Sequence, residues 1–118
     1  VVKPDQASGS QGVEIFHDSK AFSSRFPVLE RLDNTVIQEY IEGPSYSIEV
    51  VGRPGNYMAL QVTDLFMDDV YDCKRVTAPT QLSSRHIAEF EEMAIAIAEE
   101  IHLKGIMDVE VVLNENQT

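Results

Sequence analysis

The stretch Val1-Val2-Lys3-Pro4-Asp5-Gln6-Ala7-Ser8-Gly9-Ser10-Gln11-Gly12-Val13 is the part of the sequence around which the rest is organised. Its first residues predict the end of a strand, because valine suits a pleated sheet and proline cannot donate to the ladder. The next part is small, so its backbone N–H groups can approach an anion: Ser8, Gly9, Ser10 and Gly12. Lys3 adds a positive charge beside it. The stretch predicts either a phosphate-binding loop or a flexible hairpin; it is neither a Walker A motif nor GxGxxG.

The composition limits the classes of protein. With 118 residues, the chain is one domain or a piece of one. Nine Lys and Arg against 20 Asp and Glu give a net charge of −11, which argues against nucleic acid or an anionic membrane as partner. A single cysteine, Cys73, excludes a disulfide framework and favours a cytoplasmic setting. No apolar run is long enough for a membrane span.

The first third predicts a hairpin, a helix and a strand. Val13–Phe16 is expected to pair with Val1–Lys3 around the small-residue loop. Asp18 or Ser19 caps a helix that runs to about Arg25 and is broken by Pro27. The alternating segment 35–41 predicts a strand.

The remainder predicts a long hairpin, a helix and a last strand. Residues 45–65 alternate on both sides of a turn at 53–56, whereas 66–79 show no periodicity. Ser83 or Ser84 caps the strongest predicted helix. Its apolar residues recur at three- and four-residue steps and predict one buried stripe: Ile87, Phe90, Met93, Ala94, Ile97, Ala98 and Ile101.

The final strand, Asp108–Leu113, carries two acidic residues on one face. Asp108 and Glu110 are two positions apart, so they point to the same side. A solvent-facing strand surface would explain them. Alternatively, one of them binds Mg²⁺, which takes one or two carboxylates together with phosphate oxygens.

In this order the motifs VVKP–x–SGSQGV, QEYIEG, SYSIEVVG, a long helix and GIMDVEVVL resemble the ATP-grasp ligases. Within that superfamily the chain is similar to carbamoyl-phosphate-synthetase-like and D-alanine–D-alanine-ligase-like members. TDLFMDDVYDCKRVTAP and MDVEVVL most resemble the ligases of pyrrolysine biosynthesis, which join 3-methyl-D-ornithine to the ε-amine of L-lysine. The resemblance implies an α+β ATP-grasp fragment, with the small subdomain at 1–41 and part of the large C-terminal subdomain at 42–118.

The resemblance also assigns roles. It implies ATP and Mg²⁺ as cofactors and an acyl phosphate that an amine attacks. Lys3 matches the lysine that contacts ATP, the small-residue loop matches the lid over the phosphates, and Glu110 matches the first metal carboxylate. The adenine-binding hinge matches four residues, and the ribose-binding position matches a fifth: Gln38, Glu39, Tyr40, Ile41 and Ser45.

The segment after residue 65 supplies candidate substrate contacts. Asp68, Asp69 and Asp72 are expected to recognise a substrate ammonium, unless they belong to a solvated loop. Lys74 and Arg75 are expected to face the transferring phosphate or a substrate carboxylate as catalytic residues, with a surface role as the alternative.

Two departures from the family pattern stand out. Serine replaces the usual acidic residue at 45, and glutamine the usual glutamate at 38. The upstream lysine and the second metal carboxylate are missing, so this chain is expected to be a fragment that binds nucleotide weakly and does not catalyse. The implied partners are amino-acid substrates, and a homodimer is left open. The rival functions are another ATP-grasp ligase, of the D-alanine–D-alanine or carbamoyl-phosphate type, or a non-catalytic nucleotide-binding module.

Overall fold

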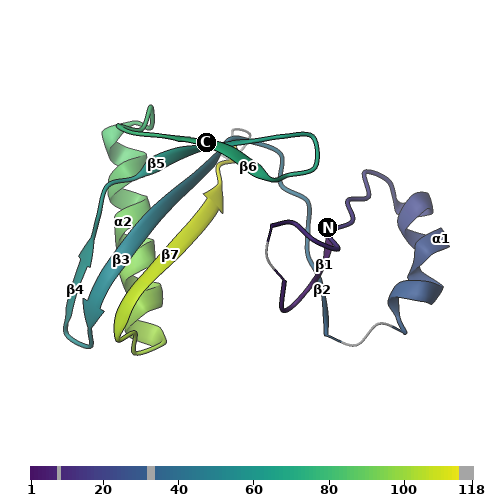
Figure 1. Cartoon of the computed structure of the whole chain (residues 1–118), viewed down its shortest axis with the longest axis horizontal. Helices are drawn as coiled ribbons and strands as arrows, with labels where there is room; N and C mark the ends of the chain where they lie inside the picture. The colour runs from purple at the N-terminus through teal and green to yellow at the C-terminus, as the bar shows by residue number, and fades with distance from the viewer. Residues whose placement is uncertain (8, 32–33, 115–118) are drawn as a thin grey trace. The chain divides into compact units, whose positions relative to one another are not determined.

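The computed structural model describes residues 1–7, 9–31 and 34–114 and confirms an α+β fold. The chain forms two compact units, one of residues 1–41 with 69–72 and the other of residues 42–68 with 73–118. Unit 1 contains three elements: β1 (Val2–Pro4), α1 (Ser19–Leu29) and β2 (Thr35–Ile37). Unit 2 contains six (Figure 1): β3 (Ser45–Arg53), β4 (Asn56–Ala59), β5 (Thr63–Met67), β6 (Cys73–Thr77), α2 (Ser84–Glu100) and β7 (Gly105–Val112).

In unit 1, β1 pairs with β2 and not with the segment that follows the loop. The two strands are antiparallel, with Val2 opposite Ile37. The predicted hairpin with Val13–Phe16 is reduced to one bridge, in which Val2 and Glu14 exchange two backbone hydrogen bonds of 2.8 Å. The next pair on that edge would join Pro4 to Gly12, and Pro4 has no N–H to donate.

The predicted cap of α1 is confirmed, and its predicted end is wrong. The Ala21 N–H donates to the Asp18 carboxylate at 2.7 Å. The helix does not break at Pro27 but continues to Leu29, and the Glu30 N–H still reaches the Phe26 carbonyl at 2.8 Å. Pro27 lies in the last turn, so it removes a single helical hydrogen bond on an exposed side of the helix, where water can replace it.

The predicted strand over 35–41 is also shorter, and it ends at Ile37. Beyond it, the Gln38 N–H and carbonyl pair with Val1 at 2.9 and 2.8 Å. The pairing with β1 stops there, and residues 39–41 are not part of a strand.

In unit 2, β3 is the central strand of a five-stranded antiparallel sheet. One edge of β3 pairs with β7 along its length, and the other edge pairs first with β5 and then with β4. The predicted long hairpin is therefore confirmed in outline. It is interrupted at residues 60–62, because the register against β3 shifts by one residue between β4 and β5.

Strand β6 was not predicted, because it lies in the segment without periodicity; it pairs with β5. Four of its five residues are exposed, so β6 lacks the alternation that marks a half-buried strand. Its pairing is antiparallel, with Leu65 opposite Val76 and an irregularity at Phe66 and Met67.

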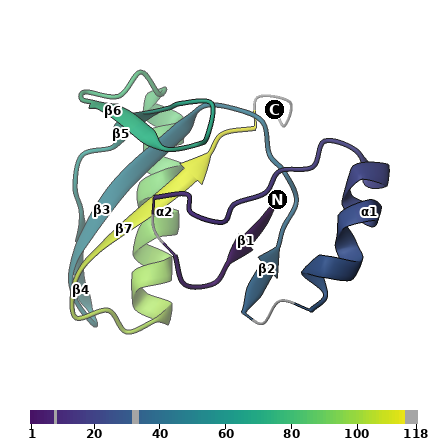
Figure 2. The ribbon, with the colours of Figure 1, turned by 45° about the vertical axis from the view of Figure 1, so that its right-hand side comes forward.

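The helix α2 lies along one face of this sheet (Figures 1 and 2). The predicted cap is confirmed, since the Ser83 hydroxyl accepts from the His86 N–H. Phe90, Ala94 and Ala98 are buried against Ile48 and Val50 of β3, and the two alanines allow the helix to approach the sheet closely.

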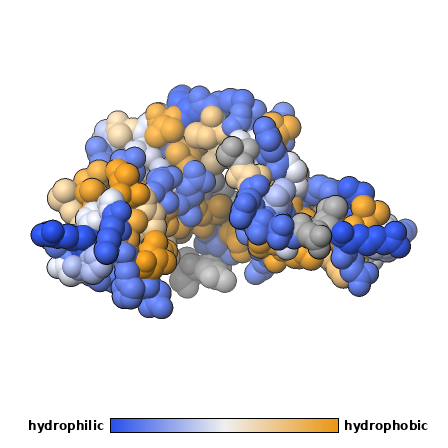
Figure 3. All heavy atoms as spheres, turned by 60° about the horizontal axis from the view of Figure 1, so that its bottom comes forward, coloured by the Kyte–Doolittle hydropathy of each residue, from blue (hydrophilic) through white to orange (hydrophobic). Residues whose placement is uncertain are grey.

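The predicted apolar stripe of α2 is wider than the face that the sheet covers. Met93, Ile97 and Ile101 keep 38–56% of their surface exposed. They follow one another at four-residue steps and lie beside the buried side of α2, where the sheet does not reach. On the face that Figure 3 shows, hydrophilic and hydrophobic residues are interspersed. Among the described residues, no helix combines the length and the apolar content that crossing a bilayer requires.

Candidate nucleotide-binding site

The small-residue loop of unit 1 has the backbone that the sequence suggested. Gly9, Ser10 and Gly12 all have positive φ, at 61°, 56° and 76°. At residue 12 only glycine fits, because a Cβ would lie 2.9 Å from Cγ of Pro4. Ser8 lies outside the described residues. A backbone of this kind can turn N–H groups toward one anion, as a phosphate loop requires.

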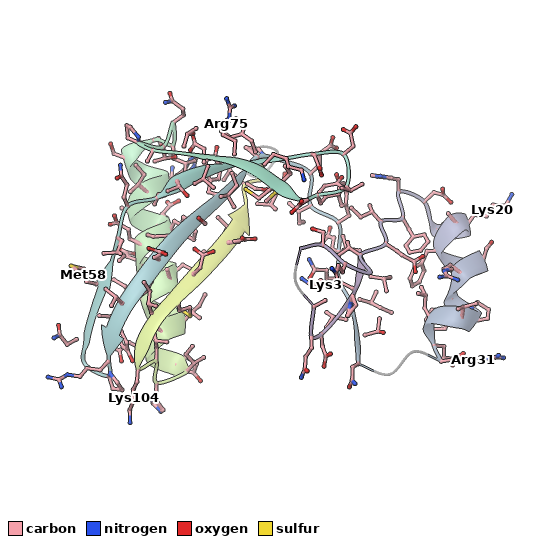
Figure 4. The ribbon with its side chains drawn as sticks, viewed as in Figure 1. Lys3, Lys20, Arg31, Met58, Arg75 and Lys104 are labelled. Atoms are coloured by element: carbon pink, nitrogen blue, oxygen red, sulfur yellow. The ribbon has the colours of Figure 1, made fainter. Side chains whose placement is uncertain are left out.

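Lys3 lies on β1 at the start of this loop, opposite Val36 of β2 (Figure 4). Its side chain is half-buried and forms no ion pair with another described residue. An ammonium group without a carboxylate partner can serve a bound phosphate.

The segment matched to the adenine-binding hinge follows β2. Its first residue, Gln38, already uses its backbone N–H and carbonyl in the pairing with Val1. Tyr40 is half-buried, and its ring meets His17 edge-on at 5.0 Å between ring centroids. Its hydroxyl lies 3.0 Å from the Tyr71 hydroxyl. Ile41 is half-buried and Glu39 is exposed.

Ser45, matched to the ribose-binding position, begins β3 in unit 2 and lines an open groove of about 470 Å³. Both apolar and polar residues line the groove: Gly43, Pro44, Ser45, Tyr46, Asp64, Leu65, Phe66, Met67 and Gln81. Asp64 is buried, and its carboxylate accepts hydrogen bonds from the Thr80 hydroxyl and the Gln81 N–H. These bonds fix the groove wall, so Asp64 is a structural residue there.

The two predicted catalytic residues, both on β6, contact side chains of their own unit. The Arg75 guanidinium lies 3.9 Å from the centroid of the Phe66 ring, in a cation–π contact. Figure 4 labels Arg75 on β6. Lys74 forms an ion pair with Asp68 at 3.3 Å. A substrate or phosphate would have to compete with Asp68 for Lys74.

The three predicted substrate aspartates are divided between the two units. Asp68 belongs to unit 2, where it pairs with Lys74, while Asp69 and Asp72 group with unit 1. Asp69 is exposed and Asp72 is half-buried.

The predicted metal carboxylate lies on the sheet face opposite α2. Glu110 is opposite Ser47 of β3, and Asp108 is opposite Glu49. Burial raises the pKa of the Asp108 carboxyl, as does the charge of Glu49, while a hydrogen bond from Ser47 acts in the other direction. A cation bound on this face would relieve the repulsion.

These carboxylates fit a magnesium ion held jointly with a nucleotide. Within the described part of the chain, no three His, Cys, Asp or Glu side chains are grouped closely enough to hold a metal by themselves. Mg²⁺ does not need such a cage, because it binds through one or two carboxylates and the phosphates of its nucleotide.

Sequence reasoning missed two residues that the structure brings to these sites, Phe66 and Tyr71. Phe66 lies in the groove beneath Arg75, and Tyr71 contacts both Ser10 and Tyr40. Neither has a signal in sequence, because both follow from pairings between distant segments. Asp108, by contrast, was visible in the sequence, because the strand alternation places it on the same side as Glu110.

Comparison with known proteins identifies the family of the chain. A family model described as an ATP-grasp domain matches residues 1–118. A 3-methyl-D-ornithine–L-lysine ligase of Methanosarcina mazei is 38% identical over 111 residues, and one of Methanosarcina acetivorans is 34% identical over 112. These alignments cover 94% of this chain but 27% and 28% of the relatives, so the chain spans about a quarter of their length. A D-alanine–D-alanine ligase of Christiangramia forsetii is 23% identical over 125 residues, covering 98% of this chain and 38% of that enzyme.

Proposed function

Since the chain belongs to the ATP-grasp family, we propose that it is part of an ATP- and Mg²⁺-dependent carboxylate–amine ligase that joins 3-methyl-D-ornithine to the ε-amine of L-lysine. The observation that carries the proposal is the 38% identity, over 94% of the chain, to a ligase of that name. In this reaction a carboxylate oxygen attacks the γ-phosphorus of ATP and ADP leaves. The amine nitrogen then attacks the acyl carbon, loses a proton and displaces phosphate.

The chain's own residues would act by positioning and by neutralising charge. The loop of Gly9, Ser10 and Gly12 would hold the phosphates with its N–H groups, together with Lys3. Tyr40 and Ile41 would pack against adenine. Glu110 and Asp108 would hold Mg²⁺, which neutralises the phosphate oxygens when it is bound.

The groove at Ser45 would receive the ribose side of the nucleotide. The Ser45 hydroxyl can hydrogen-bond a ribose hydroxyl in place of the usual carboxylate, and Phe66 and Met67 supply apolar wall. Arg75 stacks on Phe66, so we assign it to the phosphate or to a substrate carboxylate at the edge of this groove.

The experiment is a coupled assay of ADP release by the full-length protein, given ATP, Mg²⁺, L-lysine and 3-methyl-D-ornithine. Glu110→Gln should lower kcat by at least about a hundredfold, because Glu110 would hold the Mg²⁺ that neutralises the phosphate oxygens. Glu92→Gln is the control, because Glu92 is an exposed glutamate of α2 away from the carboxylate face. ADP release that needs D-alanine and not these two substrates would instead support a D-alanine–D-alanine ligase. The 23% identity to an enzyme of that name makes this the second candidate. Nucleotide binding without ADP release from any amino acid would indicate a non-catalytic module.

The amine-binding loop has a test of its own. Asp69→Asn with Asp72→Asn should raise the KM for the amine substrate at least about tenfold and leave the KM for ATP unchanged, because an ammonium group would lose its carboxylate partners. If the double variant and the wild type have the same KM for the amine, this assignment is wrong.

A further inference from the structure

Tyr71 is the point at which three segments of unit 1 meet. Its backbone carbonyl accepts a hydrogen bond from the Ser10 hydroxyl of the small-residue loop. Its own hydroxyl lies 3.0 Å from that of Tyr40, and the two rings meet edge-on with centroids 6.5 Å apart. Tyr71 itself belongs to residues 69–72, which are inserted between two strands of unit 2 but group with unit 1.

The backbone of Tyr71 is held in an uncommon conformation. Its φ is +59°, in the left-handed region that side chains other than those of Gly, Asn and Asp rarely adopt. Such a conformation persists where the surrounding contacts hold it. The contacts with Ser10 and Tyr40 hold Tyr71 in this conformation. If either contact is lost, residues 69–72 can adopt more common backbone conformations.

The residues that contact Tyr71 and the residues beside it in the sequence are assigned to different ligands. Ser10 and Tyr40 lie in the two segments assigned above to the phosphates and adenine of ATP. Asp69 and Asp72, on either side of Tyr71, are the residues assigned to the amine. A nucleotide that contacts Ser10 or packs on Tyr40 therefore acts on the residues that hold residue 71 in place.

We propose that Tyr71 is a positioning residue that makes the amine-binding segment 69–72 respond to nucleotide. This inference rests on the proposed function. Nucleotide fixes Tyr40, the hydroxyl pair with Tyr71 is retained, and residues 69–72 become ordered before the amine binds. The linkage is reciprocal, so an amine bound at this segment also raises the affinity for nucleotide.

The test is amide hydrogen exchange of residues 69–72 in the full-length protein, with and without ADP and Mg²⁺. In the wild type, nucleotide should slow this exchange. Tyr71→Phe removes only the hydroxyl, and the slowing should fall by at least about threefold, which is the scale of one hydrogen bond. Tyr40→Phe should have the same effect. The double variant should add little to it, because the two residues share one bond.

Tyr57→Phe is the matched control. It also removes a hydrogen-bonded tyrosine hydroxyl, since the Tyr57 hydroxyl donates to the Leu103 carbonyl at 2.8 Å, but it lies in unit 2 on β4. It should leave the nucleotide-dependent exchange of residues 69–72 unchanged.

The outcomes separate the two proposals. If Tyr71→Phe binds ADP and keeps the full nucleotide-dependent protection, the positioning role is wrong and the proposed function stands. Equal losses in Tyr71→Phe and Tyr57→Phe would also overturn the positioning role, since the effect would then be general. If the wild type gives no thermal shift with ADP and Mg²⁺, the proposed function fails and this inference fails with it.

Discussion

Gly43 gives the sharpest test of how the ribose end of the groove is built. It precedes Pro44 and Ser45, and it packs against the end of β7. A Cβ at residue 43 would lie 3.0 Å from the Leu113 carbonyl carbon and closer still to its oxygen. Its φ of +157° also lies in the region that favours glycine.

Gly43→Ala should therefore destabilise the protein and weaken nucleotide binding. Placing a side chain in this backbone conformation costs about 1–3 kcal/mol. Relieving the clash breaks the 2.9 Å hydrogen bond from the Leu113 N–H to the Pro44 carbonyl, which adds about 1 kcal/mol. We expect the free energy of unfolding to fall by about 2–4 kcal/mol in urea titrations, and the Kd for ADP to rise because Ser45 moves with Pro44.

Gly55→Ala is the control for this substitution. Gly55 also has a positive φ, +79°, but its Cβ would meet nothing within 4 Å. The free energy of unfolding should fall only by about 1 kcal/mol, from backbone strain alone, with ADP binding unchanged. If Gly43→Ala is no more destabilising than Gly55→Ala, the close approach of residue 43 to β7 is not what the structure indicates.

Two further predictions concern the core and the carboxylate face. Phe90→Ala should lower the free energy of unfolding by about 3–5 kcal/mol because it leaves a cavity beneath α2, whereas Met93→Ala, on the exposed side of the same helix, should cost less than about 1 kcal/mol in the same urea titration. Because burial and Glu49 raise the pKa of Asp108, its contribution to stability is present below its ordinary pKa of 3.8 and is lost as pH rises through the folded value. Asp108→Asn should therefore raise Tm by about 1–3 °C at pH 7 and lose this advantage near pH 3. An equal shift at both pH values would show that the charge of Asp108 is not responsible.

The elements with strong local signals were predictable from the sequence. Asp18 and Ser83 are good N-caps, and both act as caps. The alternation of Ser45–Arg53 predicts a strand buried on one side, and this strand became the centre of the sheet. Local chemistry decides these features, so they can be read without knowledge of the tertiary structure.

Two of the errors arose where a distant partner decides the outcome, and one where the position within a helix decides it. Segment 38–41 alternates like a strand, but the pairing with β1 reaches only to Gln38, whose partner is Val1. Pro27 is tolerated because it lies at the end of a helix. β6 forms on an exposed edge, where pairing with β5 does not require alternation. The first and the third of these outcomes depend on residues far away in the sequence.

The candidate site was predictable in residue type more than in arrangement. The glycines of the loop and the carboxylate of Glu110 carry chemistry that can be recognised from sequence alone. The ion pair of Lys74 with Asp68 and the stacking of Arg75 on Phe66 depend on the β5–β6 pairing. The sequence could name these charged residues, but it could not show that each already has a partner.

Because residues 69–72 belong to unit 1, the two units cannot be separated by a single cut in the chain. The chain passes between the units at three places, after residues 41, 68 and 72. Unit 1 is thus discontinuous in sequence, and a peptide of residues 1–41 lacks the carbonyl that Ser10 bonds and the hydroxyl that Tyr40 contacts. Cleavage after residue 41 would likewise separate Tyr71 from its partners. A faithful minimal version of unit 1 must splice residues 69–72 back onto residues 1–41 through a linker.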